Sequence, residues 1–303
     1  MSAADNLSTI LSSGMRLTAP LAFAACGEYL AQRAGTINIS VEGMMLGAAF
    51  GAVAAASATG GATTGLIVGS LVGLAIGMIH GNLVHRANIN TFVVGLVLNA
   101  LVLGLTTFLI AINTFTSNQV SRIEIPLLSD LPLIGEALFT GRWPMYLLVV
   151  IIPLTWWLVE RSRWGLELRA VGEDPVAADL TGIEVNKRRR QALMWCGLMA
   201  GLGGAYLAVG EVGSFNQNMT DGRGYIVIAA VIFGGWRLGR TILGCILFGL
   251  ADAMRLALPA MGVTLDSHLL IATPYLLAIV VMLMFASTKR EPRALGQPFQ
   301  RTI

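Results

Sequence analysis

The chain has 303 residues, of which 55% are hydrophobic and only 12% are charged. Soluble domains carry about 25% charged residues, so this deficit excludes a soluble enzyme, a secreted disulfide scaffold and a disordered chain. The net charge of +3 is too small to indicate a nucleic-acid partner. The composition therefore indicates an all-α, polytopic transmembrane helix bundle whose surface faces membrane lipid.

Nine apolar runs follow one another along the chain, and a bilayer core needs about 20 apolar residues per helix. They lie at about 9–29, 41–58, 63–84, 91–112, 145–159, 191–210, 225–235, 241–258 and 268–286. The run at 225–235 is short and ends at Gly234 and Gly235. We expect it to be a half-helix, which a membrane protein tolerates only where it lines protein or a cavity.

Basic residues are distributed unevenly between the two sides of these runs. If the segment 160–190 is cytoplasmic, 14 lysines and arginines fall inside and 3 fall outside, namely Arg122, Arg142 and Arg223. Cytoplasmic loops carry the excess of positive charge, so the C-terminus is predicted to be cytoplasmic. Ionisable residues in the first run make it a poor simple span. We therefore expect eight to ten spans and leave the side of the N-terminus open.

The loops and the tail contain no stretch that predicts a soluble lobe. We therefore expect one transmembrane domain over 1–303, with a cytoplasmic loop at about 160–190. The external stretch 113–144 contains scattered polar residues and prolines, which favour a short surface helix or cap. The segment 289–303 is polar and contains two prolines, which predicts a disordered tail.

Glycines recur every fourth residue through one predicted span, at Gly61, Gly65, Gly69, Gly73, Gly77 and Gly81. Four residues advance an α-helix by about 400°, so this stripe winds slowly around the helix. Small residues at such spacing let neighbouring helices approach closely in membranes. The stripe predicts tight packing, with a moving seam between helices as the alternative.

Polar residues inside the apolar runs are the candidates for a translocation path, because such groups are costly at membrane depth. They include Asn38, Glu42, Asn99 and Asp252. Glu42 serves either as a tie between helices or as a lining residue. Asp252 and Arg255 are three residues apart, so they either neutralise each other on one helix or lie at a cavity mouth. The amide of Asn99 suits a hydroxyl-rich ligand or a nucleobase, and it also suits a bond between helices.

Metal-binding and catalytic patterns are missing from the sequence. The three cysteines, Cys26, Cys196 and Cys245, lie singly in apolar runs, where cysteine behaves as a small hydrophobe. His80 and His85 are five residues apart and do not share a helix face. No phosphate-binding loop of the GxxxxGK[ST] type occurs. We therefore predict no cofactor, no metal and no catalytic residue.

The cytoplasmic loop contains a short helix with clear start and stop signals. Asp174 is a good N-cap, Pro175 fits the first helical position and Gly182 fits the C-terminal stop. A capped helix held between two spans is suited to dock a cytoplasmic partner. The alternative is a simple capped loop that carries positive-inside charges.

This loop resembles the coupling-helix loop of permeases of ABC importers. The similarity lies in the segments 172–183, 28–46, 222–236 and 247–253. They resemble the branch that serves simple sugars, nucleosides and branched-chain amino acids, and most closely the second permease of nucleoside systems. One departure is at 236–240, where the family commonly has a proline before the second glycine.

The resemblance implies that the coupling loop contacts a separate ABC ATPase subunit through Gly172, Glu173, Asp174, Pro175, Ala178 and Gly182. It also implies a second permease, in a heterodimer, and an extracytoplasmic substrate-binding protein, at a bacterial inner membrane. The expected function is import of nucleosides or a related simple sugar by alternating access, with ATP hydrolysed by the partner. The alternatives are a permease for branched-chain amino acids or an aldose and, in another class, a channel or an intramembrane enzyme.

Overall fold

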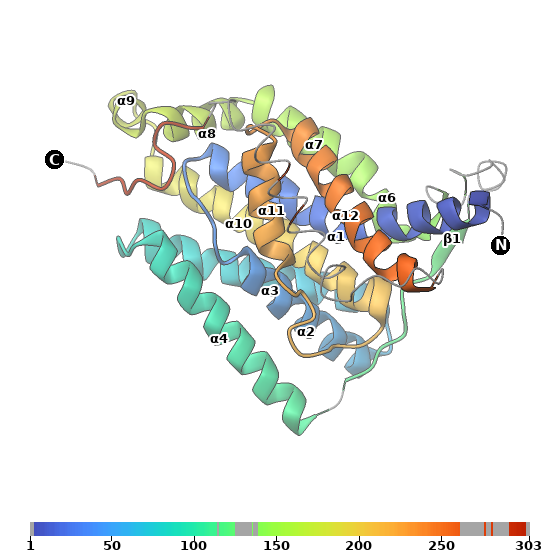
Figure 1. Cartoon of the computed structure of the whole chain (residues 1–303). Helices are drawn as coiled ribbons and strands as arrows, with labels where there is room; N and C mark the ends of the chain where they lie inside the picture. The colour runs from blue at the N-terminus through green and yellow to red at the C-terminus, as the bar shows by residue number, and fades with distance from the viewer. Residues whose placement is uncertain are drawn as a thin grey trace.

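The computed structural model describes residues 3–113, 115–124, 135, 139–260, 276, 280 and 291–300, which form a helical bundle (Figure 1). Its helices are α1 Ala3–Arg33, α2 Val41–Thr59, α3 Ala62–His85, α4 Thr91–Ile112, α6 Trp143–Tyr146, α7 Leu148–Glu160, α8 Arg163–Glu173, α9 Pro175–Leu180, α10 Val185–Ala205, α11 Arg223–Phe233 and α12 Leu238–Ala260. A π-helix, η1 Tyr206–Val212, continues α10. Two strands, β1 Arg122–Glu124 and β2 Thr140–Arg142, pair antiparallel.

Six helical segments among the described residues are long and apolar enough to cross a membrane. They are Val41–Thr59, Ala62–His85, Thr91–Ile112, Trp143–Glu160, Val185–Val212 and Leu238–Pro259. The first eight apolar runs each coincide with helical structure, which confirms the all-α polytopic bundle. The ninth run, 268–286, lies outside the described residues, so the total of eight to ten spans stays a prediction.

Helix α1 is not one of these six segments, yet it connects the two ends of the bundle. Near one end, the Arg16 side chain bonds to Glu211 of η1, with 2.8 Å between Nε and Oε2. At the other end, Arg33 lies 3.6 Å from Glu160, the last residue of α7. Arg16 and Arg33 of α1 thus have partners inside the protein, which explains how a helix of low hydropathy packs within the bundle.

The glycine stripe of α3 packs against two helices, as its slow winding predicts. A Cβ at Gly69 would lie 2.6 Å from the Ala48 carbonyl oxygen of α2. A Cβ at Gly73 would lie 2.5 Å from the Gly201 Cα of α10. Side chains cannot occupy such distances, so glycine at these positions allows backbone contact between helices. The tight packing expected from the four-residue spacing is confirmed.

The segment 113–144, where a helix or cap is predicted, contains the β1–β2 pair in its described part. Arg122 stands opposite Arg142 in this pair. Thr116 also forms an isolated antiparallel bridge with Ser214, which follows η1. Strand pairing with a distant segment is a tertiary effect, which the local polarity of the sequence did not indicate.

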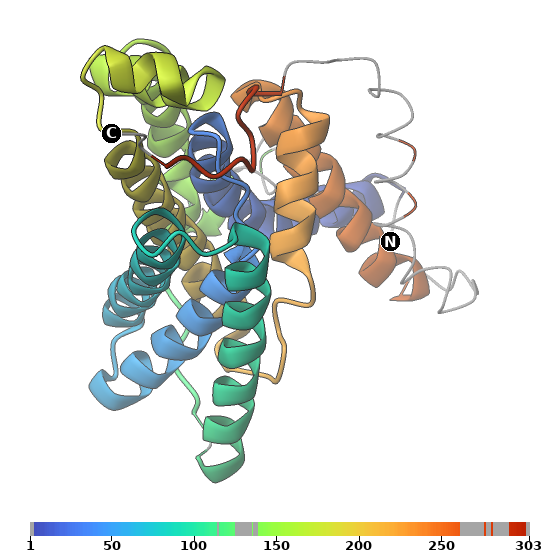
Figure 2. The ribbon, with the colours of Figure 1, turned by 90° about the vertical axis from the view of Figure 1, so that its left-hand side faces the viewer.

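Helices α8 and α9 lie across one end of the bundle (Figures 1 and 2). The last residues of α1 and α7 and the turn between α11 and α12 meet there. Arg169 of α8 donates to Glu160 (2.9 Å), and the Trp236 indole donates to Gln32 of α1 (2.8 Å). This end therefore gathers the loops for which the sequence predicts a cytoplasmic position.

Residues 291–300 also lie at this end and differ from the expected disordered tail. The Ala294 amide donates to the Gly172 carbonyl (3.0 Å), and the Gly296 amide donates to the Gly35 carbonyl (2.9 Å). Ala294 is 3% exposed, so an apolar residue anchors the segment within a mostly polar stretch. The other residues of the predicted tail lie outside the described part of the chain.

Candidate translocation and coupling sites

The N-terminus of the short helix α11 is held by the carboxylate of Glu42. Its N-cap residue, Gly222, has a φ of +78° and forms no side-chain cap. Instead, Glu42 Oε1 accepts from Thr220 Oγ1 (2.5 Å) and the Gly222 amide (3.0 Å), and Oε2 accepts from the Gly224 amide (2.7 Å). A carboxylate fits here because a helix N-terminus has unpaired N–H groups and a partial positive charge. Glu42 therefore ties α2 to α11.

Asn99 of α4 binds the other side of the same region. Its Oδ1 accepts from the Gly43 amide (2.8 Å), and its Nδ2 donates to the Ile39 carbonyl and to the Tyr225 hydroxyl (both 3.0 Å). Tyr225, in the first turn of α11, is 45% exposed. The structure thus brings two of the sequence-predicted path residues, Glu42 and Asn99, to the first turn of α11.

Asp252 of α12 lies beside the same turn and carries two ion pairs. Its Oδ1 accepts from Arg255 Nε (2.9 Å), which confirms the predicted pair, and its Oδ2 accepts from Arg223 Nη2 (2.8 Å). The sequence places Arg223 in an external loop, but its side chain is only 16% exposed. The reason is that the segment between η1 and α11 turns back along the bundle, so α11 begins partway along its length (Figure 1).

Asn38, the fourth predicted path residue, belongs to a separate buried network. Its Oδ1 accepts from Ser40 Oγ (2.7 Å), and its backbone amide donates to Glu28 Oε1 (3.3 Å). Ser40 Oγ in turn lies 2.7 Å from His80 Nδ1. All four residues are 0% exposed, so Asn38 lies within a structural tie between α1, α2 and α3.

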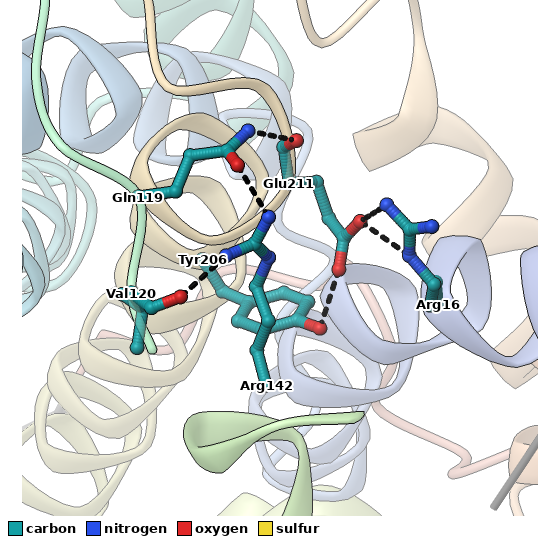
Figure 3. A network of polar contacts seen from close by, with 6 residues as sticks. All are labelled: Arg16, Gln119, Val120, Arg142, Tyr206 and Glu211. Carbon is teal, nitrogen blue, oxygen red and sulfur yellow. Dashed lines mark hydrogen bonds and ion pairs between the residues drawn. The ribbon is translucent and has the colours of Figure 1, made fainter. Parts of the chain in front are cut away.

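A further polar network near the β1–β2 end was not predicted (Figure 3). Glu211 of η1 accepts from Arg16 Nε (2.8 Å) and from the Tyr206 hydroxyl (2.7 Å). Gln119 donates to the Glu211 carbonyl (2.9 Å) and accepts from Arg142 (2.5 Å). Burial lowers the pKa of the Arg142 guanidinium, and the nearby Glu211 carboxylate opposes this shift. The sequence signals for this network are three charged residues in or beside apolar runs, Arg16, Arg142 and Glu211.

The predicted start and stop residues of α9 behave as expected. Asp174 Oδ1 accepts from the Ala177 amide (2.9 Å), and Pro175 is the first helical residue. Gly182, just after the helix, has a φ of +88°, a conformation that favours glycine. The capped short helix that the sequence predicts is therefore confirmed.

The proposed coupling residues divide into buried and exposed groups. Ala178 is 4% exposed and packs with Val171 and Val185, and a Cβ at Gly172 would overlap the Arg33 carbonyl oxygen. These two small residues therefore seat α8 and α9 on the bundle, whereas Glu173 and Asp174 are exposed.

Two apolar side chains dominate the outward surface of α9. Val176 is 61% exposed and Leu180 is 83% exposed. Sequence reasoning missed them, although their spacing of four residues, which puts both on one helix face, could have revealed them. Helix α9 therefore presents a small apolar surface, defined by Val176 and Leu180, at the α8–α9 end.

Comparison with known proteins gives a consistent group of relatives. Residues 10–288 match the family described as branched-chain amino acid transport system / permease component. The putative glucose ABC transporter permease protein TsgC13 of Haloferax volcanii is 36% identical, over 86% of this chain and 80% of that protein. The nucleoside ABC transporter permease NupC of Lactococcus lactis is 30% identical over 98% of both chains. The guanosine ABC transporter permease NupQ of Bacillus subtilis is 29% identical over 97% of both.

Proposed function

Since the chain belongs to the family of branched-chain amino acid transport system permease components, a family of ABC importer permeases, we propose that it translocates a nucleoside by alternating access. It is a multi-pass membrane protein and a transport subunit, as are its relatives named permeases. The family implies an ATPase and a substrate-binding protein as partners. We propose its ligand, its paired permease and the residues that act in transport from the contacts within the structure.

The observation that carries the ligand class is the charge balance around the first turn of α11. Arg223 and Arg255 both pair with Asp252, and the Glu42 carboxylate is occupied by three donors. The formal charges of these two acids and two arginines cancel. Both N–H groups of the Asn99 amide are donated within the protein, to Ile39 and Tyr225. The Tyr225 hydroxyl accepts from Asn99, is on an exposed residue and keeps its own O–H to donate, which suits a neutral ligand rich in hydroxyl or base nitrogen atoms.

A zwitterionic amino acid fits this region less well. Its ammonium and carboxylate groups need two free opposite charges, since an ionic group without a partner is costly in a low-dielectric site. Both arginines here are already engaged by Asp252. A simple sugar is the second candidate, because a relative at 36% identity is named a putative glucose permease.

The same polar region supports a paired permease. Tyr225 is 45% exposed, and the same turn of α11 carries Arg223, which pairs with Asp252 of the apolar helix α12. Ionisable and polar groups at membrane depth face protein or water and avoid lipid. We therefore propose that a second, different permease chain covers the α4–α11–α12 face and that the path lies between the two chains. Each chain then contributes one transmembrane domain.

The ATPase is proposed to dock on α9, through Val176 and Leu180, with Asp174 fixing the helix start. Closure of the ATPases on ATP then moves α9 and switches the bundle between outward-open and inward-open states. A ligand shifts such an equilibrium only by binding the two states with different affinity. The inward-open state is therefore expected to bind the nucleoside weakly.

The test is uptake by the complete complex of both permeases, ATPase and binding protein in proteoliposomes. Radiolabelled guanosine, glucose, ribose and leucine are offered separately, with and without enclosed ATP. Guanosine accumulation that needs ATP is expected. Uptake of leucine alone would overturn the ligand class, and solute flux without ATP would indicate a channel.

A further inference from the structure

Residues 291–300, termed here the C-terminal strap, cross the α8–α9 end of the bundle without forming a helix or strand and make a turn at 293–296 (Figure 2). Two backbone hydrogen bonds attach the strap to different elements. The Ala294 amide donates to Gly172 near the end of α8, and the Gly296 amide donates to Gly35 in the α1–α2 loop. The strap therefore connects the segment that carries α9 with the loop between two long helices.

Apolar side chains repeat this bridging pattern. Phe299 packs against the cluster that seats α9, which contains Val171, Ala178 and Val185. Leu295 packs against a second cluster, which belongs to α1, α7, α11 and the α11–α12 turn and consists of Cys26, Tyr29, Leu30, Val159, Val231, Trp236 and Leu238. The strap thus contacts the base of α9 with one side chain and the end of the membrane helices with the other.

A buried arginine fixes the middle of the strap. Arg189 of α10 is 0% exposed and donates through Nε to the Ala34 carbonyl (3.2 Å) and through Nη1 to the Gln297 carbonyl (2.7 Å). Among the described residues, its Nη2 has no hydrogen-bond partner. A buried guanidinium with two carbonyl partners and an unused donor adds little net stability to a fold, because the cost of removing its charge from water is only partly offset. Its position, which joins the strap to the end of α1, indicates another role.

We propose that the C-terminal strap is a positioning element of the transport cycle, which transmits the displacement of α9 to the α1–α2 loop and the α11–α12 turn. This inference rests on the proposed docking of the ATPase to α9. A strap that only packs would affect stability alone. A strap that couples α9 to the α1–α2 loop and the α11–α12 turn sets how much solute is moved for each ATP hydrolysed.

The experiment compares uptake and ATP hydrolysis in the same proteoliposomes of the complete complex, with guanosine and glucose as probes. The variants are a chain that ends at residue 290, Phe299→Ala and Arg189→Met. Gln300→Ala is the matched control, because Gln300 is an exposed neighbour of Phe299. Arg189→Met is also placed in the shortened chain, which lacks Gln297, the strap partner of Arg189.

We expect uptake per ATP to fall about fivefold or more in all three variants, which is the usual range of coupling between sites, while ATP hydrolysis stays within about twofold. The control retains the reference ratio. Arg189→Met adds less loss to the shortened chain than to the full-length chain, because the bond to Gln297 is removed by both changes and only the bond to Ala34 is then left to lose.

An unchanged ratio in the variants would overturn the proposal, and so would a parallel loss of uptake and hydrolysis or fully additive effects. If the shortened chain fails to assemble, the ratios of Phe299→Ala and Arg189→Met decide the matter. Failure of the reference complex to import either probe would instead contradict the proposed function. The two proposals therefore fail in distinguishable ways.

Discussion

Glu42 supplies from α2 the cap that α11 does not have in its own sequence. Glu42→Ala leaves the Thr220 hydroxyl and the Gly222 and Gly224 amides without their acceptor. Because Glu42 is only 7% exposed, water replaces the lost bonds poorly. We expect a loss of about 3 kcal/mol, which lowers the unfolding midpoint of the purified chain in detergent by roughly 6 °C or more.

Two exchanges serve as controls for this cap. Glu42→Gln keeps one acceptor oxygen and loses the charge, so its midpoint is expected between those of the reference and Glu42→Ala. Glu291→Ala changes an exposed carboxylate and leaves the midpoint unchanged. A midpoint for Glu42→Ala equal to that of the reference would show that the carboxylate does not stabilise α11.

For single residues, the sequence predicted which polar side chains lie inside the bundle better than it predicted their contacts. Glu42, Asn99 and Asp252 were predicted as polar groups inside the bundle, and they do meet around α11. Arg189 was counted among the basic residues of the cytoplasmic side, with no sign of the partners that bury it. A run of four basic residues has no local signal that distinguishes the one that points inward, because its partners, Ala34 and Gln297, are distant in sequence.

Among the elements, α3 packs with its backbone directly against that of α10. Gly73→Ala places a methyl group 2.5 Å from the Gly201 Cα of α10, so two helix backbones have to separate. We expect destabilisation of about 1–3 kcal/mol from overpacking, measured as a lower unfolding midpoint in detergent. Gly104→Ala on α4 is the matched control, because no atom lies within 4 Å of its Cβ position.

The control is expected to be neutral or to gain up to about 1 kcal/mol from helix propensity. Equal midpoints for Gly73→Ala and Gly104→Ala would contradict close packing of α3 on α10. A midpoint for Gly104→Ala below that of Gly73→Ala would mean that α4 approaches another helix more tightly than α3 does.

Element boundaries were predictable where hydropathy alone decides them. The runs expected at 41–58 and 91–112 correspond to α2 Val41–Thr59 and α4 Thr91–Ile112. The π-helix η1, the β1–β2 pair and the strap were not predicted, since each depends on partners distant in sequence. For example, the Val120 amide donates to Val209 of η1 (3.1 Å), a contact that no local pattern indicates.

For the whole molecule, the distribution of basic residues agrees with a proposed cytoplasmic position of the α8–α9 end. Arg169, Arg188 and Arg190 all find partners in the elements that meet there. We expect a green fluorescent protein fused after Ile303 to fluoresce and an alkaline phosphatase fused there to be inactive. The opposite pair of results would place the C-terminus outside and contradict the orientation.

The proposed docking of the ATPase uses the outward surface of α9, and therefore side chains that the fold does not need. Val176 and Leu180 are 61% and 83% exposed, so Val176→Gln and Leu180→Gln are expected to leave the unfolding midpoint unchanged. Burial of an exposed Val or Leu side chain in an interface removes its apolar surface from water, which contributes about 1.5–3 kcal/mol when burial is complete. We expect each exchange to weaken ATPase binding by about 2 kcal/mol, roughly 30-fold in Kd.

Affinity is measured between the purified ATPase and the permease pair in detergent, by biolayer interferometry. Leu166→Gln is the matched control, because Leu166 is 60% exposed but belongs to α8. Exchanges of Ala178 or Gly182 discriminate less well between a loss of docking and a loss of folding. Ala178 is buried and Gly182 has a φ of +88°, so a bulky residue at either position destabilises the fold itself. Reference affinity in both α9 variants would exclude docking on Val176 and Leu180. Equal weakening by Leu166→Gln would extend the docking surface to α8.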